Sequence, residues 1–298
     1  MQSILFTGAS GFLGSSILPL LKKNYDVDTL ALDANATYNI NLVNDDVHLN
    51  KRYDIILHAA GKAHVIPKTD EEIKLFYDIN YEGTKKICSA LEESGVPKSF
   101  IFISTVAVYG CDFGECITEG HSIDGDTPYA KSKIMAEEYL MDWCKNHNVI
   151  LTILRPSLLA GKNAPGNLGA MVKGIKSGRY LSIAGGKARK SVLMVQDIAK
   201  LVPLVIDKGG IYNVCDDSQP TFRELETLIS KQLGKRIPLA IPMWVAKTMA
   251  FVGNLLGPKA PINSLKLKKI TRSLTFSNEK AKTELDWIPM NVLDNYEI

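Results

Sequence analysis

Tyr129 and Lys133 form the pair of residues in this sequence that is best suited to proton transfer. They stand four positions apart, and residues with that spacing share one face of an α-helix. An ammonium group stabilises a nearby phenolate, so we expect Lys133 to lower the pKa of Tyr129 from its reference value of about 10. A tyrosine in that state can exchange a proton with the hydroxyl or keto oxygen of a substrate. The two residues alone are commonplace, and their significance depends on the rest of the chain.

A glycine-rich segment near the start of the chain provides a site for a second reactant. Gly8, Gly11 and Gly14 follow a short β-rich run at residues 3–7 and open a helical pattern at residues 12–23. In this arrangement the first glycine permits a tight turn, the second lets the backbone approach a pyrophosphate, and the third lets the helix lie against the sheet. The N-terminus of the helix adds unpaired N–H groups and a partial positive charge, so we predict a dinucleotide site here. The residues between the glycines that we expect beside the cofactor are Ser10, Phe12 and Leu13.

Asp33 indicates which dinucleotide binds. It follows the second predicted strand, 25 positions after Gly8, where a carboxylate can accept hydrogen bonds from the adenosine ribose. A 2′-phosphate would meet like charge there, and no Lys or Arg occurs between Asp33 and Asn50 to offset it. We therefore predict NAD as the cofactor, with NADP as the weaker alternative. The expected neighbours of the adenine are Asn41 and Leu42.

The elements that must position these residues alternate between strands and helices. Apolar runs predict strands over residues 3–7, 28–32, 53–58, 99–104 and 149–154, and apolar positions at helical spacing predict helices over residues 12–23, 71–94 and 129–147. This alternation is typical of an α/β fold with a Rossmann-type, doubly wound parallel sheet. Beyond residue 155 glycines become frequent, which indicates a smaller substrate-binding domain. We assign residues 1–155 and 190–216 to the NAD-binding domain, and residues 156–189 and 217–298 to the substrate-binding domain.

The composition is ordinary for a soluble globular protein, with 46% hydrophobic and 22% charged residues. The net charge of +3 comes from mixed signs, and we expect no nucleic-acid partner. The five cysteines lack the paired spacing of a zinc site, so we expect no metal. Because the chain opens on a strand without a signal peptide, we expect a cytoplasmic protein with reduced thiols.

Two segments toward the C-terminus leave alternatives open. The longest apolar stretch, Ile241–Gly257, contains Lys247 and is shorter than the ~20 residues that a membrane span needs. We expect a packed helix without stable membrane insertion, and contact with a membrane surface is the alternative. The basic run from Lys266 to Arg272 alternates with apolar residues, which predicts a solvated face with a buried stripe.

Taken together, these motifs resemble the extended short-chain dehydrogenase/reductase family in its NAD-dependent epimerase/dehydratase branch. The resemblance runs over nearly the whole chain. Besides the glycines and the Tyr129–Lys133 pair, it is carried by His58–Gly61, Asn80–Thr84, Ser104–Thr105, Val108–Gly110, Leu154–Pro156 and Glu284–Pro289. It implies that Thr105 hydrogen-bonds the reacting sugar oxygen and completes a triad with the pair, and that Asn80 stabilises the site. The further residues that we expect along the cofactor are Ala59, Ala60, Gly61, Asn80 and Ser104, together with Tyr129 and Lys133, since Lys133 can also hydrogen-bond the nicotinamide ribose.

The resemblance also implies where a substrate binds. Members of the branch that bind nucleotide sugars hold the nucleotide with a loop asparagine and the diphosphate with a basic residue ahead of a strand. Asn167 occupies that loop here, and Arg189 or Lys190 takes the basic position. Lysine is the weaker clamp for a phosphate, so which of the two binds stays open. We expect a nucleotide-sugar substrate, with a UDP-sugar favoured, and a homodimer.

Two departures from the family narrow the chemistry. Sugar dehydratases of the branch carry an Asp-Glu pair directly after the threonine of the triad, and relatives that also epimerise beside the keto group carry a Cys in that segment. This chain has Val106 and Ala107 there, so hydride transfer at one carbon remains. A 4-epimerase and a 4-keto-sugar reductase share that chemistry, and the sequence does not separate them. A reductase of a bulky non-sugar ketone and a non-catalytic dinucleotide sensor are rival functions, and the intact Tyr129–Lys133 pair argues against the sensor.

Overall fold

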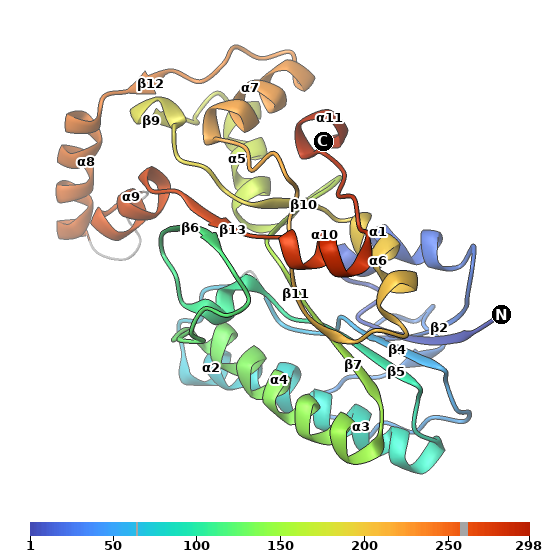
Figure 1. Cartoon of the computed structure of the whole chain (residues 1–298). Helices are drawn as coiled ribbons and strands as arrows, with labels where there is room; N and C mark the ends of the chain where they lie inside the picture. The colour runs from blue at the N-terminus through green and yellow to red at the C-terminus, as the bar shows by residue number, and fades with distance from the viewer. Residues whose placement is uncertain (64, 257–261) are drawn as a thin grey trace.

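A sheet of seven parallel strands forms the centre of the molecule (Figure 1). The computed structural model describes residues 1–63, 65–256 and 262–298. In the order of the sheet, the strands are β3 (Tyr38–Asn39), β2 (Asp26–Ala31), β1 (Ser3–Thr7), β4 (Ile55–His58), β5 (Ser99–Ile103), β7 (Ile150–Pro156) and β11 (Gly210–Val214). The order changes direction between β1 and β4, and doubly wound sheets bind ligands beyond the carboxyl ends of the strands at such a point. The predicted fold class is confirmed.

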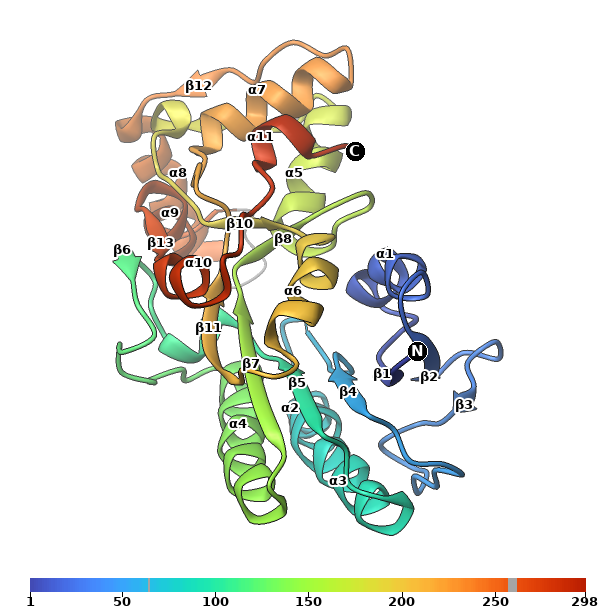
Figure 2. The ribbon, with the colours of Figure 1, turned by 45° about the vertical axis from the view of Figure 1, so that its right-hand side comes forward.

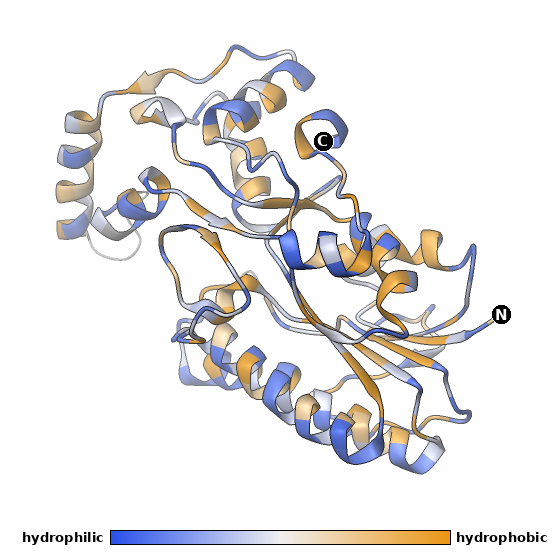
Figure 3. Ribbon diagram, viewed as in Figure 1, coloured by the Kyte–Doolittle hydropathy of each residue, from blue (hydrophilic) through white to orange (hydrophobic). Residues whose placement is uncertain are grey.

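Helices cover both faces of the sheet (Figure 2). On one face lie α1 (Phe12–Leu21), α6 (Asp197–Val205) and α10 (Glu279–Leu285), and on the other lie α3 (Gly83–Ser94) and α4 (Pro128–His147). Successive strand residues point to opposite faces, so Ile4 and Phe6 of β1 pack with the first group and Leu5 with the second. Because both faces are covered, the strands are uninterrupted apolar runs, as Figure 3 shows for the sheet.

The helix predicted over residues 71–94 is interrupted. The structure has α2 (Asp70–Tyr77), a π-helical turn (Asp78–Glu82) and then α3. A π turn inserts one residue relative to α-helical geometry, and here Asn80 is fully buried within it. The prediction of one continuous helix is wrong because the buried polar contacts of Asn80, made with residues far along the chain, stabilise this turn.

A smaller region packs beyond the carboxyl ends of the strands (Figure 1). Its core joins the strand pair β8 (Leu158–Ala160) and β10 (Val192–Met194) to α5 (Gly166–Lys176), α7 (Phe222–Gln232) and α11 (Val292–Asn295). Two further strand pairs connect it to the sheet and to the outer edge: β6 (Gly114–Ile117) with β13 (Leu274–Phe276), and β9 (Ser182–Ile183) with β12 (Ala240–Ile241).

Helices α8 (Met243–Leu256) and α9 (Ser264–Thr271) lie at the outer edge of this region. Gly257, which ends the predicted apolar stretch, lies outside the described residues. Within the described ranges, no helix is long and apolar enough to cross a membrane. The predicted domain boundaries stay a prediction, and α10, which they assign to the substrate-binding domain, packs in the core of the sheet.

A buried ion pair ties α4 to the sheet. Arg155 of β7 donates from Nη2 to Glu137 Oε2 at 2.5 Å and from Nε to Glu137 Oε1 at 3.1 Å, and both side chains are almost fully buried. Its remaining nitrogen, Nη1, donates to the Tyr109 hydroxyl at 3.0 Å, which in turn donates to Asn213 of β11 at 2.7 Å. The network is fully paired, so loss of one charge would leave the other buried and unpaired.

We therefore expect Arg155→Met to lower the free energy of unfolding by about 3–5 kcal/mol in chemical denaturation. The double variant Arg155→Met with Glu137→Leu removes both charges and should recover much of that loss. Lys98 and Asp207 form an exposed pair at 2.6 Å, and Lys98→Met should cost less than about 1 kcal/mol. Equal losses for Arg155→Met and Lys98→Met would contradict this role of the network.

Candidate active site

A cavity of about 260 Å³ opens where β1 and β4 end. Eight of its lining residues are ones that the sequence predicts beside the cofactor: Gly8, Ser10, Gly11, Asn41, Leu42, Ala59, Ala60 and Gly61. Five lining residues were not predicted: Leu30, Ala31, Leu32, Ile40 and Ile79. Leu30 and Ala31 end β2, and Leu32 follows them just before Asp33. Because ligands bind beyond the carboxyl ends of parallel strands, these three residues could have been predicted. Nothing in the sequence marks the other two.

The glycines shape this cavity through the space that they leave. Gly8 has φ +77°, and a Cβ there would lie 2.6 Å from the Ala60 nitrogen, so only glycine fits between β1 and β4. A Cβ on Gly14 would lie 2.3 Å from the Gly8 carbonyl oxygen, which keeps α1 against the strand. Gly11 caps α1 without any side-chain hydrogen bond, so the first N–H groups of the helix stay available to an anion.

The other eight predicted neighbours of the cofactor do not line the cavity. Four of them, Asn80, Ser104, Tyr129 and Lys133, are described below. Phe12 and Leu13 pack against the apolar cores instead, and Gly14 contacts backbone. Asp33 lies one residue beyond Leu32, and its Oδ1 accepts the N–H of Asn35 at 2.8 Å. Its carboxylate thus keeps a second oxygen for another donor.

Tyr129 and Lys133 are positioned by the first turn of α4. Thr127 caps the helix by accepting the Ala130 N–H at 3.2 Å, and Pro128 is its first residue. The Lys133 side chain is 4% exposed and donates to the Ile103 carbonyl at 2.9 Å. A Cβ on Gly61 would lie 3.2 Å from Lys133 Nζ, so the ammonium flanks the end of the cavity.

Burial dominates the protonation of both residues. It lowers the pKa of Lys133 to about 8, and the carboxylate of Glu137 opposes that fall. It raises the pKa of Tyr129, and a side-chain hydrogen bond from Thr105 opposes that rise. The expectation that Lys133 lowers the pKa of Tyr129 is therefore wrong for this structure, because the ammonium is directed to the Ile103 carbonyl. Thr105, by contrast, lies next to the phenol as predicted.

Asn80 connects the cavity to α4. Its Oδ1 accepts the Lys62 N–H at 2.7 Å, and its Nδ2 donates to the Lys62 carbonyl at 3.1 Å and to Ser132 Oγ at 2.9 Å. Ser132 lies three residues after Tyr129 in α4. The Asn80 side chain therefore joins the segment that follows β4, at Lys62, to the start of α4. Ser104 has another contact: its hydroxyl donates to Glu137, in the buried network rather than toward the cavity.

His58 connects two neighbouring elements through its ring nitrogens, and this role was not predicted. It is fully buried, with Nδ1 at 2.6 Å from Thr7 Oγ1 and Nε2 at 2.9 Å from Thr84 Oγ1. Thr84 donates to the Asn80 carbonyl at 2.7 Å, so the histidine donates from Nε2 and accepts at Nδ1. Burial lowers the pKa of His58 to about 3, and the neutral ring links the end of β1 to the π turn.

The predicted substrate residues lie in the smaller region. Asn167 is exposed in the first turn of α5, and Arg189 is exposed and donates to the Gln219 carbonyl at 3.1 Å. Lys190 is half-buried and donates to the Arg272 carbonyl at 3.2 Å. Burial lowers the pKa of Lys190 to about 8, and an anion beside it would raise that pKa again by favouring the charged form. Over the described residues, no group of three His, Cys, Asp or Glu side chains is placed to hold a metal ion.

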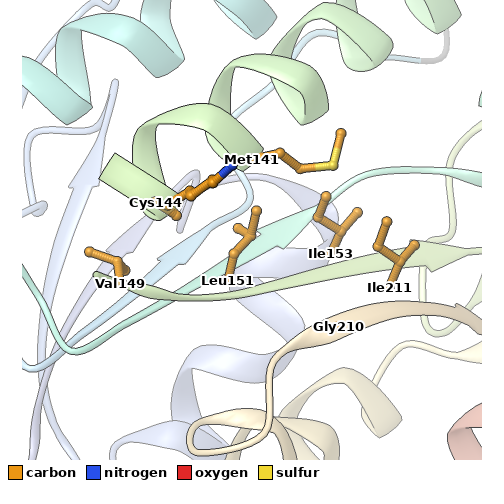
Figure 4. A pocket seen from close by; sticks show the side chains of 8 residues that line it. Met141, Cys144, Val149, Leu151, Ile153, Gly210 and Ile211 are labelled. Atoms are coloured by element: carbon orange, nitrogen blue, oxygen red, sulfur yellow. The ribbon is translucent and has the colours of Figure 1, made fainter. Parts of the chain in front are cut away.

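A second pocket lies between α4 and the strands β7 and β11, at one side of the sheet (Figure 4). Apolar side chains line it, among them Met141, Leu151 and Ile211. Met141 is twelve residues along the helix from Tyr129, which is about 18 Å. Burial raises the pKa of Cys144 at its wall to about 12, so this thiol is not a nucleophile at neutral pH. This pocket offers no group for the predicted chemistry.

Comparison with known proteins agrees with this geometry. The NAD dependent epimerase/dehydratase family matches residues 4–215. The chain is 28% identical, over 94% of its length and 88% of the relative's, to N-acetyl-alpha-D-glucosaminyl-diphospho-ditrans,octacis-undecaprenol 4-epimerase of Escherichia coli O157:H7. It is 25% identical, over 98% and 92% of the two chains, to UDP-glucose 4-epimerase of Vibrio cholerae.

A solved structure shares the fold. It is UDP-glucuronic acid 4-epimerase from Bacillus cereus in complex with NAD, which superimposes with a TM-score of 0.75 at 18% identity and covers 99% of this chain and 95% of its own. With the family match extending over more than two thirds of its residues, the chain belongs to the NAD-dependent epimerase/dehydratase family.

Proposed function

We propose that this protein is an NAD-dependent enzyme that inverts C4 of a sugar carried on a diphosphate, most simply a UDP-sugar. One observation carries the proposal: Lys133 flanks Gly61 at the end of a glycine-lined cavity, and Tyr129, which is hydrogen-bonded to Thr105, stands one turn earlier on the same helix. The two sequence relatives, both named as 4-epimerases, favour the epimerase over the 4-keto-sugar reductase.

The residues of the cavity fit a dinucleotide. A backbone cradle that a Cβ on Gly8 would fill, next to a helix N-terminus without a side-chain cap, is suited to a pyrophosphate. The second oxygen of Asp33 suits a ribose hydroxyl. When bound there, NAD would supply reversible hydride exchange with the sugar carbon.

The proton chemistry falls to the chain's own side chains. Tyr129 in its phenolate form takes the proton of the sugar hydroxyl as the hydride leaves, and the resulting phenol returns it afterward, while Thr105 orients the reacting oxygen. Lys133 donates to the Ile103 carbonyl here, so its stabilisation of that phenolate requires the ammonium to turn toward Tyr129, one helical turn away. Asn80 helps to position Tyr129 and Lys133, because it joins the segment at Lys62 to α4, the helix that carries them.

The diphosphate of the substrate is assigned to the smaller region. The names of the two relatives share a sugar linked to a diphosphate, in one case through undecaprenol and in the other through UDP. Lys190, half-buried with a depressed pKa, is the residue best suited to that group, with Arg189 beside it and Asn167 toward the nucleotide. We assign substrate covering to residues 156–189 and 217–298, and the homodimer stays a prediction.

An assay with two substrates tests the reaction. The purified protein, without added cofactor, should convert UDP-N-acetylglucosamine or UDP-glucose into its 4-epimer, because an epimerase keeps its cofactor through the cycle. Consumption of NADH with a UDP-4-keto-6-deoxy sugar, and no epimer from the first two, would instead establish the reductase. If the protein acts on no sugar diphosphate but turns over a steroid- or flavonoid-like ketone, its substrate is a bulky ketone instead of a sugar.

Removing one hydroxyl tests the role of Tyr129. Tyr129→Phe should lower kcat by about 10²–10⁴-fold while the melting temperature and NAD affinity stay unchanged, because only the proton-transfer group is lost. Tyr139→Phe makes the same chemical change on the same helix, ten residues away, and should keep full activity. Full activity of Tyr129→Phe would refute the assignment, and loss of NAD binding in that variant would indicate a structural role.

The choice of cofactor is tested at Asp33. The protein should bind NAD more tightly than NADP, and Asp33→Ala should narrow the ratio of the two dissociation constants about fivefold or more, as expected for loss of a like-charge contact of about 1 kcal/mol. Asp46→Ala removes an exposed carboxylate from the same stretch of chain and serves as control. The assignment fails if the two cofactors bind the native protein equally, or if both variants behave alike in titration calorimetry.

A further inference from the structure

Helix α8 lies at the outer edge of the molecule (Figure 1), and several of its large apolar side chains are exposed. Trp244, Phe251 and Leu255 are 72%, 65% and 76% exposed. They are spaced by seven and four residues, which places them on one side of the helix, with the half-exposed Val252 at its border. Scattered apolar residues are normal on a protein surface, but three large ones in one stripe form a patch that marks an interaction site.

The other side of the helix accounts for its packing. Ala246 and Ala250 are buried and form a small cluster with Leu267 of α9. Small side chains at these positions let α9 lie close to α8. The exposed stripe is therefore not needed to hold α8 in the fold, and the predicted packed helix is packed on one face only.

The stretch of chain that contains α8 and α9 carries charge of one sign. Residues 227–278 contain nine Lys and Arg and no Asp or Glu, so the rest of the chain, in a protein of net charge +3, carries an excess of six negative charges. Lys247 is exposed on α8, and Lys268, Lys269 and Arg272 are exposed on or directly after α9. The basic run is thus a solvated face, as predicted, with Lys269 in an ion pair with Asp112 at 2.9 Å. Lys247, three residues after Trp244 and four before Phe251, borders the apolar stripe.

We propose that the α8–α9 surface docks the protein on an anionic membrane. Helices that lie in a bilayer interface insert Trp, Phe and Leu while Lys and Arg meet the negative headgroups, and this surface has both components. Each basic residue near such a surface contributes attraction that decays within a Debye length. A second copy of the chain is the poorer partner, because a symmetric interface would bring two basic surfaces together.

The docking surface is joined to the proposed diphosphate site. Lys190 donates to the carbonyl of Arg272, and the backbone of Arg189 accepts the N–H of Leu274 at 3.0 Å. When the protein is docked, the diphosphate of a lipid-linked sugar, which lies at the level of the headgroups, would therefore be near Arg189 and Lys190. That use rests on the proposed function, whereas the docking itself does not.

Vesicle binding tests the docking directly. Cosedimentation of the full chain with phosphatidylcholine vesicles containing phosphatidylglycerol should be strong, weaker with phosphatidylcholine alone, and reduced by salt. Trp143 and Trp287 are buried, so a blue shift of tryptophan emission on binding reports Trp244 entering an apolar environment. Absence of binding to the anionic vesicles would overturn the proposal, as would binding without a blue shift.

Matched variants locate the surface. Phe251→Glu with Leu255→Glu should lower partitioning onto anionic vesicles about tenfold or more, and Lys268→Gln with Arg272→Gln should lower it about fivefold per residue. The controls are Ile288→Glu, which changes a residue 82% exposed outside α8, and Lys22→Gln with Lys23→Gln, and both should bind as the native protein does. Equal losses in controls and test variants would overturn the proposal.

Two further measurements separate this inference from its rivals and from the proposed function. Sedimentation velocity of the Phe251→Glu, Leu255→Glu variant should give the same oligomeric state as the native protein, and dissociation of an oligomer would assign the face to a second copy instead. The native protein should turn over a soluble UDP-sugar in the absence of vesicles. Vesicle binding without such turnover would leave the docking intact and reject the proposed function.

Discussion

The architecture depends on one close backbone approach, between Gly8 at the end of β1 and Ala60 just after β4. A Cβ at Gly8 would lie 2.6 Å from the Ala60 nitrogen, so any side chain there would push apart the two strands between which the sheet order changes direction. The same contact orients α1, since Gly14 packs on the Gly8 carbonyl and leaves no room for a side chain. This contact therefore determines where the uncapped N-terminus of α1 lies and where the glycines line the cavity.

A chain of buried hydrogen bonds connects the end of β1 to α4, the helix of Tyr129 and Lys133. From the end of β1, the hydroxyl of Thr7 contacts His58, which contacts Thr84 in the helix that follows the π turn. The amide of Asn80 then binds the backbone at Lys62 and the helix that begins beside Tyr129. Each of these groups is paired, and buried groups that are paired hold one geometry because leaving one unpaired costs more than the bond contributes.

Much of this could be predicted from the sequence, and the exceptions have physical causes. Strands such as Ser3–Thr7 were predictable because burial on both faces demands a continuous apolar run, and Gly8 because only glycine allows its turn. The π turn at Asp78–Glu82 was not, since contacts distant in sequence stabilise it. The raised pKa of Tyr129 depends on burial and on where Lys133 points, neither of which spacing reveals. The exposed face of α8 could not be told from a buried one, because an apolar run has the same sequence in both settings.

The central claim is that one carbon of the sugar gives up a hydride and receives the same hydride back, with Tyr129 handling the proton. The most direct measurement uses a UDP-sugar with deuterium at C4, in ordinary water, followed by mass spectrometry and NMR of the 4-epimer. We predict that the product keeps its deuterium at C4, because the hydride never exchanges with solvent. Loss of the deuterium to water would show that the carbon is inverted by proton exchange, and would contradict the hydride mechanism.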